Sequence, residues 1–252
     1  MNKEVKKFYK DRERLIESNS ENKKLQDAKN KFNEFSNKAK YSYNFSWMGR
    51  PIIQYPQDMI AMQEIIWEIK PDLIIEAGIA HGGSLIYYSS LLELTGDNDA
   101  IVLGIDVDIR KHNRILIESH KMSKRIKMIE GDSTSSDIAK KVYDLAKNKK
   151  RIIVCLDSNH THDHVLKELK IYAPLTSIGS YCVVFDTIID DLPADYMPDG
   201  RPRPWNPGNN PKTAVNDFLK HNSDFQIDKN IDNKILISVS PGGYLKRVKT
   251  EI

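Results

Sequence analysis

The chain has little cysteine, no long apolar run and almost no excess of charge. Only two cysteines occur in 252 residues, Cys155 and Cys182, and both lie inside short apolar segments, so we expect reduced core residues. The net charge of +3 argues against nucleic acid as the main partner. No run approaches the ~20 apolar residues that a membrane helix needs, and the N-terminal segment lacks the apolar core of a signal peptide. These absences favour a cytoplasmic protein that acts neither on membranes nor on nucleic acid.

Two common nucleotide-binding motifs are also missing. The segment from Glu76 to Ser84 is rich in glycine, but Ala80 occupies the third position of the dinucleotide fingerprint G-x-G-x-x-G. The next acidic residue at a strand end, Asp106, lies farther from Gly78 than the ~20 residues typical of dehydrogenases. No Lys-Ser or Lys-Thr pair follows the glycines, as a P-loop requires. A nicotinamide enzyme and a P-loop protein are therefore disfavoured.

Acidic residues close five separate apolar runs that are rich in Ile and Val. Because helix-length amphipathic stretches separate these runs, they predict parallel strands of one doubly wound α/β sheet, whose carboxyl ends form a ligand crevice. One such acid is typical of a loop or a helix N-cap, but five in the same position predict a functional edge. The five are Glu76, Asp106, Asp132, Asp157 and Asp186.

The alternation of patterns predicts the order of the elements. A helix that starts at Pro56 and Asp58 leads into the first strand. Residues 1–40, dominated by Lys, Glu, Asp and Asn, predict an N-terminal helical extension packed on the main domain, 41–252, or on a partner subunit. Strands are expected at 73–77, 101–106, 126–130, 151–156 and 180–185, and helices at 83–95, 109–120, 135–147 and 161–171.

The alternation stops after residue 187. Prolines at 193, 198, 202, 204, 207 and 211 predict a loop over 188–210, far longer than the ~2 to 6 residues usual in α/β units and typical of a lid. Asn210 and Pro211 predict the start of a helix that runs to about residue 221. The segments FQID, KILISV and YLKRV predict terminal strands with an antiparallel hairpin.

The glycine segment fits the E-x-G-x-x-x-G pattern of class I methyltransferases, which have a Rossmann-like fold and bind S-adenosylmethionine. Its glycines let the backbone turn sharply and approach a ligand before the helix starts. Asp106 is placed to accept hydrogen bonds from the ribose hydroxyls, and Asp132 and Ser133 to contact adenine, although Asp132 is equally typical of an N-cap. The predicted cofactor-binding set is Glu76, Gly78, Gly82, Ser84, Asp106, Asp132 and Ser133.

A second cluster follows strands four and five. Asp157 and Asp186 end adjacent predicted strands, and two carboxylates plus water suffice to hold Mg²⁺ or another divalent cation. His160, three residues past Asp157, is predicted to be the general base that deprotonates an acceptor hydroxyl. For His162 and His164 we favour solvent-facing positions in the first turn of a helix over metal ligation.

These motifs closely resemble a known family. The stretches WMGRPIIQYPQDM, IWEIKPDLIIEAGIAHGGSL, LDSNHTHDHVLKELKIYAPL, GSYCVVFDT and RPWNPGNNPKTAV are similar to the cephalosporin hydroxylase or rhamnosyl O-methyltransferase family over about residues 40–248. The resemblance implies an S-adenosylmethionine-dependent O-methyltransferase, commonly oligomeric, that acts on a hydroxyl of a sugar or another small polar metabolite. It also implies a magnesium site at Asp157 and Asp186 and a catalytic His160.

One position departs from the family pattern. Relatives commonly have Glu directly before the second metal aspartate, where this chain has Phe185. Either Asp157, Asp186 and water hold the cation, or Asp190 or Asp191 completes the site, or the metal has been lost. Two other functions remain open: an iron hydroxylase that uses the HTHDH segment as a facial triad, and a non-catalytic nucleotide-binding scaffold. The acceptor itself is not identified: Tyr196, Arg201, Arg203 and Trp205 are suited to stack on a sugar ring or pair with a phosphate, but they are equally typical of an ordered proline-rich loop.

Overall fold

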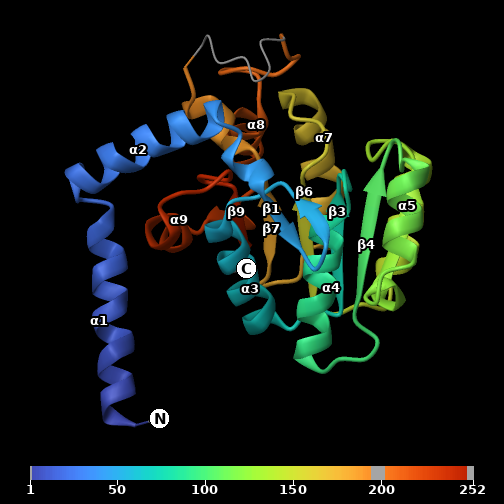
Figure 1. The fold of residues 1–252 in the computed structure, drawn as a ribbon, viewed down its shortest axis with the longest axis horizontal. Helices are drawn as coiled ribbons and strands as arrows, with labels where there is room; N and C mark the ends of the chain where they lie inside the picture. The colour runs from blue at the N-terminus through green and yellow to red at the C-terminus, as the bar shows by residue number, and fades with distance from the viewer. Residues whose placement is uncertain (1, 194–201, 249–252) are drawn as a thin grey trace.

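A seven-stranded sheet forms the centre of the molecule. The computed structural model describes residues 2–193 and 202–248. The strand order is β5-β4-β3-β6-β7-β9-β8, in which β9 runs antiparallel to both of its neighbours. The predicted Rossmann-like α/β fold is therefore confirmed (Figure 1). The strands are β3 (Leu73–Ala77), β4 (Ile101–Asp106), β5 (Ile126–Glu130), β6 (Ile152–Leu156), β7 (Tyr181–Val184), β8 (Phe225–Ile227) and β9 (Tyr244–Arg247).

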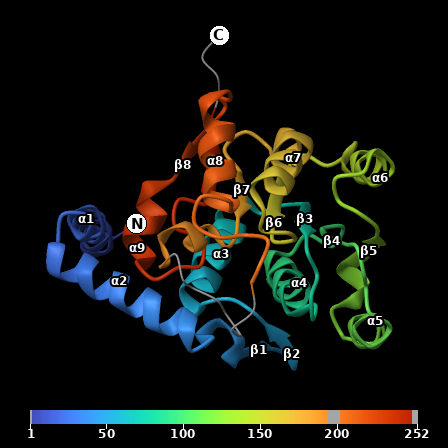
Figure 2. The same ribbon diagram turned by 90° about the horizontal axis from the view of Figure 1, so that it is seen from above.

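Helices cover both faces of this sheet (Figure 2). One face carries α3 (Pro56–Ile69), α4 (Gly83–Thr95) and α5 (Lys111–Glu118), and the other carries α6 (Ser136–Ala146), α7 (His162–Tyr172) and α8 (Pro211–Lys220). Because apolar side chains cover both sides, every residue of β3 and β6 is buried, which explains their continuous Ile- and Val-rich runs. The carboxyl ends of the parallel strands are left to form a crevice.

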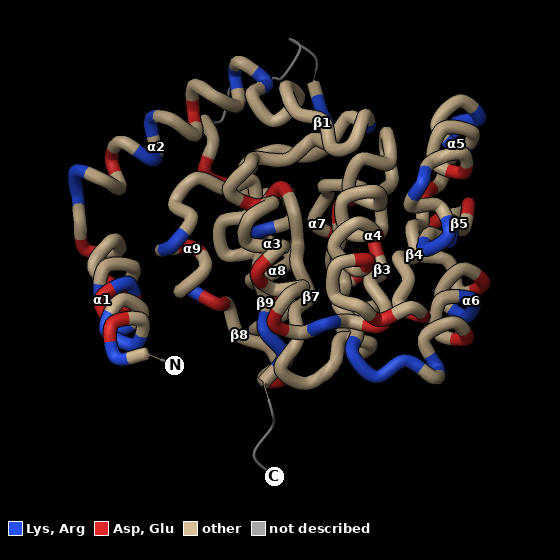
Figure 3. The backbone as a smooth tube through the Cα atoms, turned by 60° about the horizontal axis from the view of Figure 1, so that its bottom comes forward, with Lys and Arg blue, Asp and Glu red and all other residues tan. Residues whose placement is uncertain are grey.

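The N-terminal helices form an arm beside this domain. α1 (Lys3–Asn19) and α2 (Lys23–Lys38) meet at a bend, and α2 passes over the end of the molecule toward which the arrow of β4 points (Figure 1). Ser36 bonds to the Tyr55 hydroxyl at 2.8 Å, and the Asn19 side chain donates to the carbonyl of Asn233 at 2.9 Å. Basic and acidic residues are interspersed along both helices (Figure 3). The division at residue 40 and the oligomeric state stay predictions.

The C-terminal part differs from expectation in one element. The segment KILISV, residues 234–239, was predicted to be a strand, but its first two residues end a helix, α9 (Lys229–Ile235), and 236–239 form neither helix nor strand. Ile231 and Ile235 are both buried, and Asp228 caps the helix through the backbone N–H of Asn230. Their spacing of four residues places both on one face of α9, which packs against α1 and α3. The antiparallel pair is instead β8 with β9, joined through α9.

Short elements complete the described chain. A hairpin of β1 (Phe45–Trp47) and β2 (Arg50–Ile52) precedes α3 and was not predicted. Within the predicted lid, 188–210, a 3₁₀ helix η4 covers Thr187–Asp191, while 194–201, including Tyr196 and Arg201, lie outside the described residues. The remaining 3₁₀ helices are η1 (Tyr41–Asn44), η2 (Ser123–Arg125) and η3 (Ala173–Leu175).

Two predictions about the interior can be checked directly. Cys155 and Cys182 are buried and unbonded on the adjacent strands β6 and β7, as expected. Within the described ranges, no helix combines the length and the apolar character needed to cross a membrane.

Candidate active site

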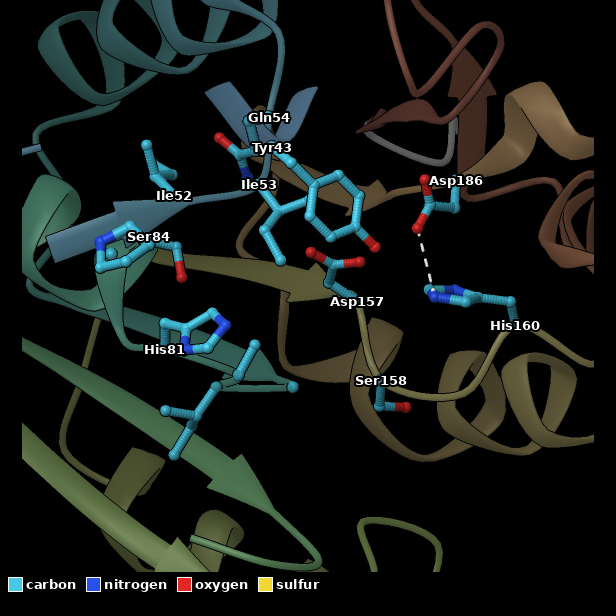
Figure 4. Close-up of a pocket in the computed structure, with 15 residues that line it drawn as sticks. Tyr43, Ile52, Ile53, Gln54, His81, Ser84, Asp157, Ser158, His160 and Asp186 are labelled. Carbon is cyan, nitrogen blue, oxygen red and sulfur yellow. Dashed lines mark ion pairs between the residues drawn. The ribbon is translucent and has the colours of Figure 1, made fainter. Parts of the chain in front are cut away.

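Three adjoining cavities lie at the carboxyl ends of the parallel strands. The first, about 450 Å³, lies between β4, β5 and β6, and we call it the cofactor cavity. The second, about 200 Å³, shares Gly78, Asp157 and Ser158 with the first, and we call it the central cavity (Figure 4). The third, about 270 Å³, shares His160 and Asp186 with the second, and we call it the outer cavity. Together they form one continuous crevice.

The glycine loop brings two strand ends into contact. Gly78 has a φ of +98°, and a Cβ at this position would lie 2.0 Å from the carbonyl oxygen of Asp157. Only glycine therefore lets the end of β3 approach β6 this closely. Gly82, with φ +79°, starts α4, and a Cβ there would strike Ile117 of α5. The predicted loop glycines thus have steric roles that position the wall between the first two cavities.

Asp106 fastens this loop from the end of β4. Its Oδ2 accepts hydrogen bonds from the backbone N–H groups of Ile79 (2.8 Å) and Ala80 (3.3 Å), and its Oδ1 accepts from Asp108 (3.1 Å). Ala80 has a φ of +45°, in the left-handed region that non-glycine residues rarely adopt. Oδ1 keeps a further lone pair, and Asp106 lines the cofactor cavity, so a ribose hydroxyl can still bind there.

Arg50 and Asn113 also support this loop, through hydrogen bonds to its carbonyl groups. No sequence motif predicted these contacts. The buried Arg50 donates to the carbonyl of His81 at 3.0 Å and to the Asn113 side chain at 2.9 Å. Asn113 in turn donates to the carbonyl of Ala80 at 2.9 Å. These bonds hold the strained backbone of the loop in one conformation.

Glu76 does not line any of the three cavities. Its carboxylate is fully buried, where Oε2 accepts from the Ser84 hydroxyl at 2.7 Å and Oε1 has no partner among the described residues. Burial raises its pKa to about 8, and the neighbouring charge of Asp106 adds to the effect. Ser84 lines the central cavity. The structure therefore places Glu76 behind Ser84, so that any influence on a ligand passes through this hydroxyl.

The loop after β5 contains Asp132 and Ser133. The N-cap of α6 is Ser135, so the N-cap alternative for Asp132 is wrong. Asp132 accepts instead from the backbone N–H and the hydroxyl of Thr134, both at 2.8 Å, which lowers its pKa. Ser133 is buried, and its hydroxyl donates to Glu168 of α7. Both residues line the cofactor cavity, but the Ser133 side chain is turned toward Glu168.

Asp157, His160 and Asp186 converge where the central cavity meets β6 and β7. One ligand atom from each lies within 4.8 Å of the others, and within the part of the chain that the structure describes no other such group of three is found. His160 Nε2 is 3.2 Å from Asp186 Oδ2 (Figure 4). Burial raises the pKa of Asp157 well above its usual range, and the nearby charges of Asp186 and Glu76 raise it further. Asp186 has a φ of +55°, a strained conformation that aims its carboxylate at this cluster.

Aromatic side chains flank this cluster. The Tyr43 hydroxyl points toward Asp157 (Figure 4), and burial together with Asp186 raises its pKa. The Trp205 ring packs edge-on against His160 with centroids 4.9 Å apart, and Arg203 lies over the same ring at 5.5 Å. The outer cavity is lined by Tyr43, Trp205 and Arg203, together with His160 and Asp186 of the cluster. Trp205 and Arg203 were expected near an acceptor, whereas Tyr43 was missed because η1 carries no sequence motif.

Several other expectations about ligands are corrected. His162 Nδ1 contacts the Thr213 hydroxyl at 2.9 Å, whereas His164 Nε2 lies 3.3 Å from Glu168, so the HTHDH segment does not assemble a facial triad. His164 is also not solvent-facing, because it lines the cofactor cavity. Asp190 accepts from Gly208 and Asn210, and Asp191 pairs with Lys212, so neither reaches the cluster.

Comparison with known proteins identifies the family. The sequence profile of the family described as Rhamnosyl O-methyltransferase/CmcI matches residues 39–248. The chain belongs to this family. The rhamnosyl O-methyltransferases of Mycobacterium bovis and Mycobacterium tuberculosis are each 31% identical to it over 205 residues, which cover 80% of this chain and 78% of theirs. The predicted O-methyltransferase family is therefore confirmed.

Solved structures share the fold. CmcI in a ligand-free form superposes with a TM-score of 0.60 at 22% identity, over 82% of this chain and 78% of CmcI. CmcI with magnesium and S-adenosylmethionine gives 0.54 at 21% identity over the same shares. An O-methyltransferase from Bacillus cereus in complex with S-adenosylhomocysteine gives 0.51 at 12% identity, over 79% of this chain and 81% of that one. At these identities the comparisons establish the fold alone.

Proposed function

We propose that this member of the Rhamnosyl O-methyltransferase/CmcI family transfers a methyl group from S-adenosylmethionine to a hydroxyl of a sugar or another small polar metabolite. The observation that carries the proposal is the junction at Gly78 and Asp157. There a cavity with a ribose-binding carboxylate, Asp106, opens onto a cluster suited to activating a hydroxyl. The sulfonium of the donor is already reactive, so the protein needs mainly to align it with an oxygen and remove a proton.

The cofactor cavity supplies the groups that the nucleoside half of the donor requires. Asp106 accepts from the ribose through Oδ1, and Asp132 and Ser133 border the adenine. Val107, which follows Asp106, is 72% exposed at the same cavity and offers an apolar surface to the base. The methionine half extends past Gly78 into the central cavity, where Ser84 presents its hydroxyl. Gly82 and Glu76 act on the donor indirectly, by setting the loop and by holding Ser84.

The cluster fits a hard divalent cation such as Mg²⁺. Burial and the nearby charge of Asp186 both raise the pKa of Asp157, and a cation between the two carboxylates would offset both effects. Asp157 and Asp186 would hold the cation, with water in place of a ligand from the buried Phe185. When bound, the cation would lower the pKa of the acceptor hydroxyl.

His160 is the group that takes the acceptor proton in this proposal. Its ring is held between Asp186 and the edge of Trp205, and only 18% of its side chain is exposed. Asp186 keeps the imidazole oriented toward the outer cavity, where the acceptor would enter beside Tyr43 and Trp205. The proton moves from the acceptor oxygen to the imidazole as that oxygen attacks the methyl carbon, whose bond to the sulfonium sulfur breaks to leave S-adenosylhomocysteine.

The first test measures donor binding. Titration calorimetry with S-adenosylhomocysteine should show binding, and Asp106→Ala should weaken it by about 1.5 to 3 kcal/mol, as for a lost charge-assisted hydrogen bond. Asp108→Ala is the matched control, because Asp108 is also an exposed acid of the same loop but does not line the cavity. Unchanged affinity in Asp106→Ala would show that Asp106 does not bind the ribose.

The second test measures transfer. S-adenosylmethionine with an isotopically labelled methyl group is incubated with free sugars, glycosides and nucleotide sugars, with magnesium or with excess chelator. Product with magnesium and little product with chelator supports the proposal, and Asp157→Asn should lower the rate while leaving donor affinity nearly intact. Donor binding without transfer to any acceptor would favour the non-catalytic scaffold instead.

A further inference from the structure

A buried polar network lies under the cofactor cavity, and its central residue has no part in the function described so far. Its centre is Glu168 of α7, whose side chain is completely buried. One oxygen, Oε1, accepts from the hydroxyls of Ser133 and Ser158 and lies 3.3 Å from Nε2 of His164. The three partners come from the loop after β5, the end of β6 and the first turn of α7. All three line the cofactor cavity.

An ordinary helix-surface ion pair does not explain this arrangement. His164 and Glu168 are four residues apart on α7, and exposed pairs of this kind contribute only ~0.3 to 0.5 kcal/mol. Here the carboxylate is removed from solvent, and its second oxygen, Oε2, has no partner among the described residues. Burying a carboxylate costs free energy unless it has hydrogen-bond partners. The partners of Glu168 are residues that line a binding cavity.

The geometry leaves one donor of His164 available. Nε2 faces Glu168 and the Ser133 hydroxyl, at 3.3 and 3.2 Å, while Nδ1 makes no hydrogen bond to any residue of 2–193 or 202–248. The ring is partly exposed, at 23%, and the surface it exposes belongs to the cofactor cavity. A charged imidazole donates from both nitrogens, so the second proton would point into the cavity.

We propose that His164 is a cofactor-binding residue that donates a hydrogen bond from Nδ1 to a ring nitrogen of adenine, and that Glu168 is the positioning residue that holds it there. The inference rests on the proposed binding of S-adenosylmethionine. Adenine is the acceptor of this bond because His164 shares its cavity with Asp106, Asp132 and Ser133 and does not line the central cavity that contains the cluster of Asp157.

The protonation of His164 supports this role. The hydrogen bond to Glu168 raises its pKa above the usual value, and Asp132 adds to the effect, while burial and the positive charge of Lys167 oppose it. These are the charged groups that face the ring from α7 and from the loop after β5. Because the charged imidazole is the better donor, adenine binding would be strongest below this raised pKa and would weaken as the pH rises through it.

The test is titration calorimetry of the full chain with S-adenosylhomocysteine. His164→Ala should weaken binding ~10-fold or more, as for a hydrogen bond from a charged group. His162→Ala is the matched control, because this neighbouring histidine contacts Thr213 and lines none of the three cavities, and its affinity should stay within about 2-fold. Equal affinity in wild type and His164→Ala would overturn the proposal.

Proton uptake provides a second readout that a structural role would not change. Titrations in two buffers of different ionisation enthalpy should show that wild type takes up protons on binding near the raised pKa, and that His164→Ala does not. Glu168→Gln should shift the pH profile of affinity to lower pH. An unaltered profile in Glu168→Gln would refute the positioning role. If wild type binds the ligand but transfers no methyl group, the proposed function fails while this inference stands, whereas absence of binding to wild type overturns both.

Discussion

The two sides of the crevice are built in different ways. Most residues of the cofactor side directly follow β3, β4, β5 and β6, so the hydrogen bonds of one sheet fix their relative positions. The outer side is formed by segments that are distant in sequence: η1 and its neighbours, η4 with Leu192, Trp205, and Val239 before β9. One side is therefore as rigid as the sheet, and the other depends on tertiary contacts between loops. Asp157, His160 and Asp186 lie where the two sides meet.

The largest expected effect comes from His160 at this boundary. His160→Ala should lower the rate constant of transfer ~10²- to 10⁴-fold, because the acceptor hydroxyl loses its base. The affinity for S-adenosylhomocysteine and the melting temperature should change little, because the cofactor side does not depend on this side chain. His162→Ala, two residues later at the start of α7, serves as the control. Near-normal turnover in His160→Ala would assign the base to another group and leave His160 as an orienting partner of Asp186.

The same variant separates a base from a metal ligand. If His160 binds the cation, His160→Ala should raise the magnesium concentration needed for half-maximal rate, and excess magnesium should restore much of the activity. If it is the base, the loss should persist at saturating magnesium. Restoration by magnesium would therefore contradict the proposed role.

The cofactor side was predictable because its signal is local. A run such as DLII fixes both the strand β3 and the place where it ends, so Glu76, Asp106 and Asp157 could be assigned to one edge from sequence alone. What the sequence could not supply is the direction of each side chain. Glu76 turned out to be buried behind Ser84, and His164 faces the cavity because Glu168, four residues later, holds it. Such partners are visible only once α7 packs against the loop after β5.

The outer side was not predictable for a corresponding reason. Tyr43 lies in a one-turn 3₁₀ helix with no periodicity, and only the position of η1 against the sheet edge brings its hydroxyl to the cluster. KILISV has the composition of a strand, but α9 ends at its second residue, Ile235, and the remainder forms no regular element. Asp58 fitted a helix start, yet its carboxylate bonds to a segment about 180 residues away. Long-range contacts of this kind leave no local pattern.

Asp58 gives the next largest effect and probes the support of the outer side. It is fully buried in α3 and accepts from the Ser238 hydroxyl, the Val239 backbone and the Tyr244 hydroxyl, at 2.6, 2.9 and 2.7 Å. Val239 lines the outer cavity, so this carboxylate anchors one of its walls. Burial raises the pKa of Asp58 from 3.8 to about 6.

The raised pKa of Asp58 determines how the free energy of unfolding depends on pH. Because the pKa is higher in the folded state, the folded chain binds the proton more tightly than the unfolded chain, and this contribution to stability is lost as the pH rises from about 4 to 6. Relative to Asp58→Asn, wild type should lose on the order of 3 kcal/mol over this range. Urea unfolding at a series of pH values measures it. Asp58→Asn serves as the reference because burial also raises the pKa of Asp232 to about 6. Asp232 titrates over the same range in both proteins, so its contribution cancels in the difference between them. A difference that does not vary with pH would show that Asp58 stays charged.

The smallest expected effect concerns Trp205, which lines both the cofactor cavity and the outer cavity. If the two sides act separately, Trp205→Leu should act mainly on the acceptor, because a ring beside His160 offers a stacking surface for a sugar worth ~0.5 to 1.5 kcal/mol. The KM for the acceptor should then rise about 2- to 13-fold, the equivalent of that energy, while the affinity for S-adenosylhomocysteine changes less. Steady-state kinetics with saturating donor give the KM of the acceptor, and a parallel titration gives the affinity for S-adenosylhomocysteine.

Val107→Ala is the matched control, because Val107 is an exposed apolar residue that lines the cofactor cavity but not the other two. This substitution should weaken binding of the donor more than binding of the acceptor. If Trp205→Leu instead weakens binding of the donor more than binding of the acceptor, Trp205 serves mainly the cofactor cavity. The crevice would then not divide into two independently built sides.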